Sequence, residues 1–264
     1  MEKSDKPQLR AVEEAAPAAP AKEGEPASAR RRGIYLLPNV ITTGALFSGF
    51  YATIAGINGR VGAAVLAILA AIALDTADGR IARLTRTQSQ FGAQYDSLSD
   101  LVAFGVAPAF VAFSWGLSSL GQVGLVLTFL YIACTALRLA RFNTHNDLSS
   151  FTGLPSPAAA AVVACTLWVG QEQIAGPPNL FVASAMGVVM VVVALLMVSN
   201  LAYFSAKQLG LKGRVPFVAL VLVVLSFAVL LADPPGILLL LSVGYALSAP
   251  AQFAWGWLRR QKPE

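Results

Sequence analysis

Four aspartates lie between long apolar segments of this chain: Asp75, Asp78, Asp96 and Asp100. An ionised carboxylate at membrane depth is costly, so such residues persist where partners and a function retain them. The first two are three residues apart and the last two are four residues apart, so each pair shares one helical face. If the chain reverses near Thr87–Gln88, the outer aspartates face each other and so do the inner ones. Four converging carboxylates are typical ligands for a hard divalent cation, Mg²⁺ or Mn²⁺.

Small residues accompany these carboxylates. Gly79 and Ala82 follow the first aspartate pair at helical spacing, and Gly92 precedes the second pair by one turn. They remove side-chain bulk, so a phosphorylated ligand can approach the backbone. Arg83 adds a planar donor fork suited to phosphate. Bound cations, an arginine and small residues together predict a pyrophosphate site, at which one carboxylate is free to take a proton from an attacking hydroxyl.

The composition determines which kind of protein can hold this site. The 264 residues are 56% hydrophobic and 12% charged, with a mean hydropathy of +0.65, which indicates an all-α, polytopic membrane helix bundle. Cys134 and Cys165 both lie in apolar runs and are interpreted as packing residues. The net charge of +5 fits basic loops beside anionic lipid. Nucleic acid is not an expected partner, because no basic stripe alternates with aromatic residues.

The apolar segments divide the chain into three parts. Residues 1–32 are rich in Ala, Pro, Glu and Lys and are expected to form a disordered cytoplasmic tail. Residues 33–200 are expected to contain a six-helix catalytic core, and residues 201–264 two additional spans with a short basic tail. Eight segments have spanning or near-spanning length: 38–57, 61–83, 92–115, 120–141, 152–170, 180–199, 215–232 and 236–256.

The positions of Lys and Arg predict the orientation. They occupy both terminal tails, the loop between the second and third segments, the end of the fourth segment and the loop between the sixth and seventh, with Arg60 as the exception. An even number of spans with both ends in the cytoplasm satisfies the positive-inside rule. We therefore expect a multi-pass protein of a bacterial inner membrane whose aspartate site faces the cytoplasm.

Eight residues at fixed spacing carry a family resemblance: Asp75, Asp78, Gly79, Ala82, Arg83, Gly92, Asp96 and Asp100. This pattern resembles the signature of the CDP-alcohol phosphatidyltransferase family, and every signature position is filled. The resemblance implies that the four aspartates bind the metal and that Asp100 is also the general base. It further implies that Asp75, Asp78, Gly79, Ala82 and Arg83 contact the cytidine diphosphate.

Flanking segments extend the resemblance to residues 33–200. Segments 37–50, 91–109, 136–143 and 151–161 are similar to the branch of the family that uses L-serine as acceptor. This likeness implies the substrates CDP-diacylglycerol and L-serine, the products phosphatidylserine and CMP, a divalent metal, and a homodimer in the lipid bilayer.

Two further residue pairs have less specific patterns. Asn39 and Thr42, near the start of the first span, either border the nucleotide site, as the resemblance suggests, or cap a helix after Pro38. Arg138 and Arg141, at the end of the fourth span, either anchor the helix at the membrane surface or bind an anion. That anion would be the carboxylate of the acceptor or a lipid phosphate.

Two alternative functions follow from the same residues. A proton or ion relay in a transporter also uses intramembrane carboxylates, but it leaves the small residues and Arg83 unexplained. The second alternative is the same enzyme chemistry with another alcohol as acceptor: glycerol 3-phosphate, inositol phosphate or choline. A phosphorylated acceptor requires extra basic residues, and Arg138 and Arg141 would supply part of that cluster.

Overall fold

The computed structural model describes residues 29–85, 87, 89–144, 153–174, 176–203 and 231–260. Its regular elements, within these residues, are all helical: α1 (Ala29–Ile57), α2 (Val61–Thr85), α3 (Gln90–Asp100), η1 (Leu101–Val106), α4 (Ala107–Trp115), η2 (Leu117–Leu120), α5 (Gln122–Thr144), α6 (Ser156–Gln173), α7 (Leu180–Val198) and α9 (Pro234–Arg260). This arrangement confirms the all-α class.

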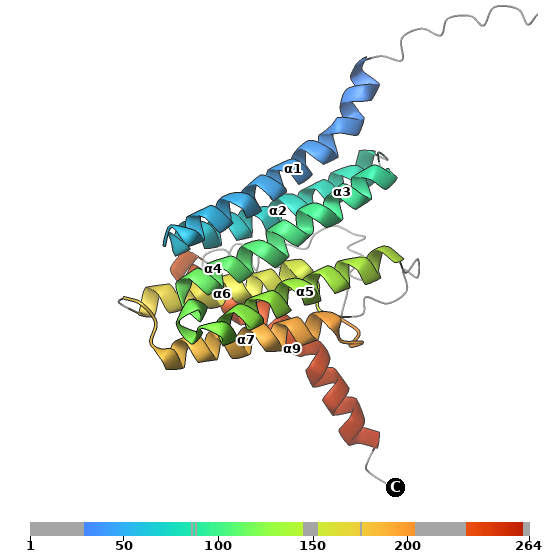
Figure 1. The fold of residues 1–264 in the computed structure, drawn as a ribbon. Helices are drawn as coiled ribbons and strands as arrows, with labels where there is room; N and C mark the ends of the chain where they lie inside the picture. The colour runs from blue at the N-terminus through green and yellow to red at the C-terminus, as the bar shows by residue number, and fades with distance from the viewer. Residues whose placement is uncertain are drawn as a thin grey trace, which may run out of the picture.

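The helices form two packed groups (Figure 1). Helix α1 packs along α2, α3 and α4, while α5 packs on α7 and α6 packs on α9. The two groups meet where α2 packs on α6, and where the segment from α3 through η1 to α4 contacts both α1 and α5. Glycine permits a close approach of α1 to η1: a Cβ on Gly49 would lie 2.6 Å from the Cα of Ala103, and small residues let membrane helices pack at such short range.

Six helices in the described part of the chain are long and apolar enough to cross a membrane. They correspond to six of the eight expected segments. The expected segment 152–170 folds as α6, which is not among the six because its eighteen residues end in the polar run Gln171, Glu172 and Gln173. Segment 215–232 lies outside the described residues. The multi-pass character is therefore confirmed, whereas the count of eight is not.

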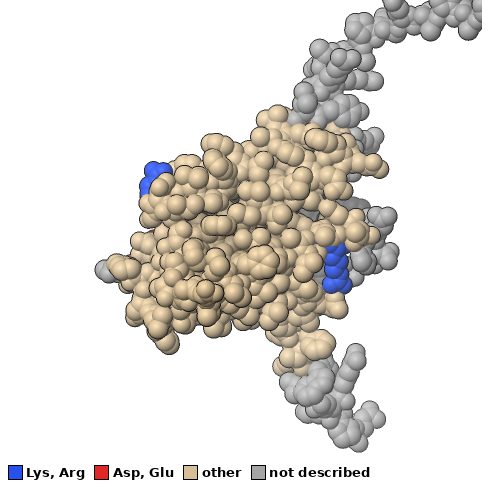
Figure 2. Space-filling model, viewed as in Figure 1, with Lys and Arg blue, Asp and Glu red and all other residues tan. Residues whose placement is uncertain are grey.

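The surface agrees with a membrane location. On the face shown in Figure 2, basic side chains of the described residues are confined to two ends of the bundle, and the area between them is free of charge. Large apolar side chains are exposed on α1, α5 and α7, including Phe47, Phe129 and Leu195. Such a surface is stable against hydrocarbon rather than water.

Helix α1 begins earlier than the sequence pattern predicted. It starts at Ala29, so residues 29–32, assigned to the disordered tail, are helical; residues 1–28 lie outside the described part. Pro38 is consequently inside α1. The interpretation of Asn39 and Thr42 as a helix cap is therefore wrong, because both residues lie within the helix.

Candidate active site

The hairpin of α2 and α3 brings the four aspartates together. The chain leaves α2 at Thr85 and re-enters helix at Gln90, where the Ser89 hydroxyl accepts a hydrogen bond from the Gly92 amide at 3.0 Å and caps α3. Carboxylate oxygens of three aspartates lie within 4.8 Å of one another: Asp75, Asp78 and Asp96. The fourth, Asp100, is hydrogen-bonded to Asp75.

This arrangement fits a divalent cation. Asp78 is only 4% exposed, and Asp96 interacts electrostatically with both Asp75 and Asp78. Like charges this close repel strongly where water is scarce. The buried oxygen Oδ1 of Asp96 has no hydrogen-bond partner among the described residues, and such an atom normally has one. Carboxylate oxygens are the hard donors that Mg²⁺ or Mn²⁺ binds, and one of them here has no hydrogen-bond partner among the described residues. The residues present therefore fit the expected metal.

Helix α1 closes one side of the aspartate cluster. The Thr42 hydroxyl, which is buried, donates a hydrogen bond to Asp78 Oδ2 at 2.8 Å. The Ser99 hydroxyl in turn donates to the Thr42 carbonyl at 3.2 Å. Asn39 lies beside Gly92, since a Cβ on that glycine would be 3.4 Å from Asn39 Oδ1. Thr42 thus orients a carboxylate, an interaction that its position in the sequence did not reveal.

The surface of α2 next to the carboxylates is open. Gly79 and Ala82 are half-buried and Arg83 is exposed. A Cβ on Gly79 would meet only the Nη2 atom of Arg83, at 3.9 Å. The guanidinium therefore borders a glycine-lined space beside the acidic cluster, as expected of a surface that receives a phosphorylated ligand.

A π-helical segment follows Asp100 directly. Residues Leu101–Val106 form η1, and the buried Tyr131 hydroxyl of α5 donates to the Phe104 carbonyl at 3.1 Å. A π-turn shifts the helical phase and occurs frequently at functional sites. Here it lets Asp100 face the aspartate cluster while the next residues pack on α1 and α5. The apolar sequence of residues 101–106 did not indicate a π-helix.

Replacing Tyr131 with Phe tests the role of this hydrogen bond. The variant keeps the buried ring but leaves the Phe104 carbonyl without its donor in an apolar interior, which costs about 1–3 kcal/mol. We expect a lower midpoint of thermal unfolding in detergent micelles. Tyr51→Phe, at a 39% exposed position, is the matched control and should unfold as the parent does. Equal midpoints for both variants would contradict this account of η1.

Arg138 of α5 reaches the cluster from the opposite side. Its Nη1 atom donates to Ser156 Oγ at 2.9 Å, and its charge interacts with Asp100. Its buried Nε has no hydrogen-bond partner in the described residues. Arg141, one turn further along α5, has an exposed side chain. The two arginines therefore have different environments.

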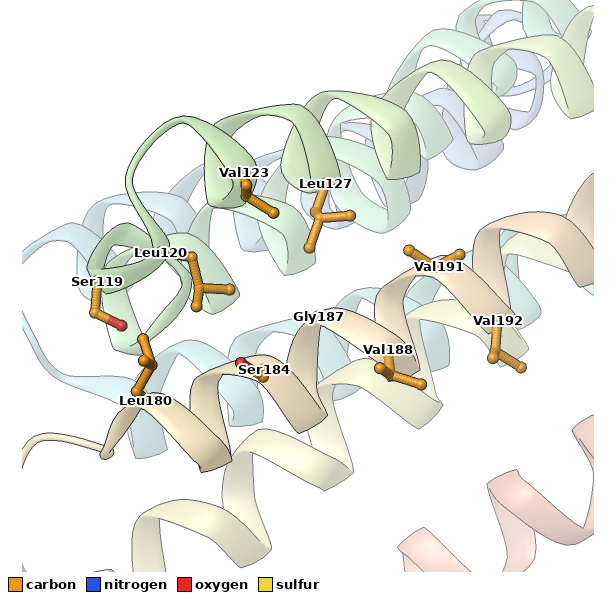
Figure 3. Close-up of a pocket in the computed structure, with 10 residues that line it drawn as sticks. All are labelled: Ser119, Leu120, Val123, Leu127, Leu180, Ser184, Gly187, Val188, Val191 and Val192. Carbon is orange, nitrogen blue, oxygen red and sulfur yellow. The ribbon is translucent and has the colours of Figure 1, made fainter.

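The cavity in Figure 3 lies elsewhere. It measures about 500 Å³, and its lining is apolar apart from Ser119 and Ser184. Leu127, in its wall, precedes Arg138 by eleven residues on α5, which is roughly 16 Å along a helix. Without a charged group it suits hydrocarbon and cannot hold a pyrophosphate. The remaining lining residues are Leu120, Val123, Leu180, Gly187, Val188, Val191 and Val192.

A polytopic helix bundle whose helical hairpin carries a cluster of potential metal ligands is typical of a class of membrane enzymes. Comparison with known proteins identifies the family. Residues 35–198 match the model of the CDP-alcohol phosphatidyltransferases. The chain therefore belongs to the CDP-alcohol phosphatidyltransferase family and is a multi-pass membrane transferase of phospholipid biosynthesis. Helix α9 lies outside the matched segment.

Relatives come from bacteria and an archaeon. A CDP-diacylglycerol–serine O-phosphatidyltransferase of Helicobacter pylori is 36% identical over 199 residues, which cover 73% of this chain and 81% of that protein. One from Mycobacterium tuberculosis is 39% identical over 145 residues, covering 52% of this chain and 50% of its own. An archaetidylserine synthase of Methanothermobacter thermautotrophicus is 30% identical over 177 residues, covering 66% and 72%.

Proposed function

We propose that this enzyme transfers the phosphatidyl group of CDP-diacylglycerol to the hydroxyl of L-serine, giving phosphatidylserine and CMP. The observation that carries the proposal is the convergence of four aspartates beside an open, glycine-lined helix surface and a half-buried arginine. The names of the relatives, which specify serine as acceptor, support the choice of alcohol.

The four aspartates are assigned to the metal, and Asp75 and Asp78 also to the CDP moiety. Asp75, Asp78 and Asp96 offer three ligand atoms close together, and Asp100 completes the set. A bound Mg²⁺ or Mn²⁺ would neutralise the pyrophosphate and make phosphorus more electrophilic. Beside them, Gly79 and Ala82 leave room for the ligand. The remaining residues assigned to CDP are Arg83, which supplies a phosphate donor, and Asn39 and Thr42, which close the α1 side.

Asp100 is assigned as the general base. It accepts the proton of the serine hydroxyl while the hydroxyl oxygen forms a bond to the phosphorus that bears diacylglycerol. The bond from that phosphorus to the bridging oxygen breaks, and CMP leaves with the electron pair. Arg138 and Arg141 are assigned to the anionic group of the acceptor or to a lipid phosphate, since each is a fixed cation at the same end of α5.

The topology and assembly are part of the proposal. We place the aspartate site at the cytoplasmic face of a bacterial inner membrane, supported by the excess of Lys and Arg in the segments expected on that side. We also propose a homodimer in the bilayer, on the family resemblance. Labelling of single engineered cysteines from either side tests the orientation, and crosslinking in membranes tests the dimer.

An acceptor assay tests the reaction. Membranes containing the protein are incubated with CDP-diacylglycerol, Mn²⁺ and one labelled acceptor at a time: L-serine, glycerol 3-phosphate, inositol phosphate or choline. Labelled lipid is expected from serine alone, with release of CMP. Labelled lipid from another alcohol but not from serine would refute the assignment of the acceptor.

The Thr42 hydrogen bond predicts a specific change in metal dependence. Thr42→Val keeps the shape of the side chain but removes the donor to Asp78. Loss of a group that orients a metal ligand typically weakens metal binding 10–100-fold, so the Mn²⁺ concentration for half-maximal activity should rise at least about 10-fold. Thr43→Val is the control, because the Thr43 hydroxyl contacts Asn39 and Tyr95 instead. The same Mn²⁺ dependence in both variants would count against Asp78 as a ligand.

A further inference from the structure

Helix α9 contributes to the surroundings of the active site although it lies outside the segment that matches the family. It packs along α6, the helix that carries Ser156 at its first position. Tyr245 of α9 lies within electrostatic range of the Arg138 guanidinium. Three helices therefore meet at one arginine: α5 carries it, while α6 and α9 supply its neighbours.

The contacts of Arg138 leave one edge of the guanidinium without a hydrogen-bond partner in the described residues. Its Nη1 atom is engaged by the Ser156 hydroxyl, and Ser156 is only 1% exposed. The Nε atom is buried without a partner in the described residues. A guanidinium carries five N–H donors in a rigid plane, and its Nε edge matches the two oxygens of a carboxylate. An arginine that is hydrogen-bonded at one edge, and whose Nε–H has no acceptor, can bind an anion at the other edge.

Tyr245 is itself held in place. Its ring packs on Tyr203, with 5.6 Å between the ring centroids. The Tyr203 hydroxyl donates to the Ala246 carbonyl at 2.9 Å. Pro250, four residues further on inside α9, has no N–H to offer that carbonyl. Tyr203 therefore supplies the hydrogen bond that the proline removes, while the contact between the two rings, which Phe at position 203 would retain, holds Tyr245.

The chemistry of a serine acceptor requires a base and an anion site side by side. The hydroxyl and the carboxylate of serine are separated by only two carbon atoms, so a group that binds the carboxylate must be a neighbour of the base. Arg138 meets this condition, because its charge interacts with Asp100. A group that binds a lipid phosphate does not have to be a neighbour of the base.

We propose that Ser156 and Tyr245 are positioning residues that hold the Arg138 guanidinium beside Asp100, so that its Nε edge receives the carboxylate of an amino-acid acceptor. This inference rests on the proposed function. It gives α9 a role in selecting the acceptor, and it separates Arg138 from the exposed Arg141.

Kinetics of the purified full chain test the inference. The Michaelis constants for serine and for CDP-diacylglycerol are measured with saturating Mn²⁺ in the parent, Tyr245→Phe and Ser156→Ala. Ser156→Ala removes a hydrogen bond to the guanidinium and Tyr245→Phe removes a polar group near it. In both variants KM for serine should rise roughly 10-fold, while KM for CDP-diacylglycerol stays unchanged. The preference for serine over 2-aminoethanol, which lacks the carboxylate, should fall by the same factor.

Tyr203→Phe is the matched control. It removes a hydroxyl from the neighbouring ring and lowers the thermal unfolding midpoint, but it should retain the parent KM for serine. Equal increases in KM for serine in Tyr203→Phe and Tyr245→Phe would overturn the proposal, because packing of α9 would then explain both. A rise in KM for CDP-diacylglycerol instead would also overturn it, by assigning Arg138 to the lipid phosphate. Failure of the proposed function is seen separately, as a parent enzyme that releases no CMP with serine.

Discussion

Asp100→Asn is expected to slow the release of CMP by about 10²–10⁴-fold, the usual contribution of a general base. Asn has the shape of Asp and can still hydrogen-bond to Asp75, but it cannot take the proton of the attacking hydroxyl. The substitution also removes one negative charge from a crowded cluster, so the protein should remain folded. The measurement is CMP release at saturating serine, CDP-diacylglycerol and Mn²⁺, together with the thermal unfolding midpoint.

The control for this prediction is the same chemical change at Asp233. The Asp233 carboxylate accepts a hydrogen bond from the Gly236 amide at 3.1 Å, at the start of α9, and Asn caps helices about as well as Asp. Asp233→Asn should therefore keep both activity and stability. Near-normal turnover in Asp100→Asn would show that the base is a different group, even if Asp100 remains a metal ligand.

The aspartate hairpin was predictable because its information is local. Residues three or four apart share a helical face in any α-helix, and the reversal lies close in sequence to both pairs. The structure accordingly brings Asp75 to Asp100 and places Asp78 with Asp96. The helical class and most of the spans followed equally from composition and length.

Features that depend on packing were not predictable. The π-turn of η1 is encoded in an apolar run whose hydropathy is the same for α- and π-helix, and the Tyr131 hydrogen bond that satisfies it spans 27 residues. Hydropathy also did not separate α6, a largely buried helix with a polar end, from spans that face lipid. The hydrogen bond of Arg138 to Ser156 and the proximity of Tyr245 involve three helices, so no local spacing indicates them.

The connection before α6 determines where Ser156 lies, and Gly153 is its most constrained residue. Its φ is +83°, a conformation that costs residues with a side chain about 1–3 kcal/mol. Its amide donates to the Leu201 carbonyl at 2.9 Å, and the Leu154 amide donates to the Leu196 carbonyl at 3.0 Å. These bonds attach the start of α6 to the end of α7, three residues before the partner of Arg138.

Gly153→Ala is therefore expected to lower the free energy of unfolding by roughly 2–5 kcal/mol, because backbone strain and overpacking add. The new Cβ would collide with the Met197 carbonyl oxygen. Displacement of α6 would also withdraw Ser156 from Arg138, so KM for serine should rise in the protein that remains folded. Unfolding in detergent micelles and serine kinetics measure the two effects.

Gly59→Ala separates strain from collision. Gly59 has a similar φ of +72°, but a Cβ there would meet nothing within 4 Å. That variant carries only the strain of a left-handed residue, about 1–2 kcal/mol, and it is remote from Ser156 in the chain, in the turn between α1 and α2. It should keep the parent KM for serine. If the two variants lost equal stability and serine affinity, the close contact between Gly153 and Met197 would not be what positions α6. The proposed effect of Gly153 on Arg138 would then be wrong as well.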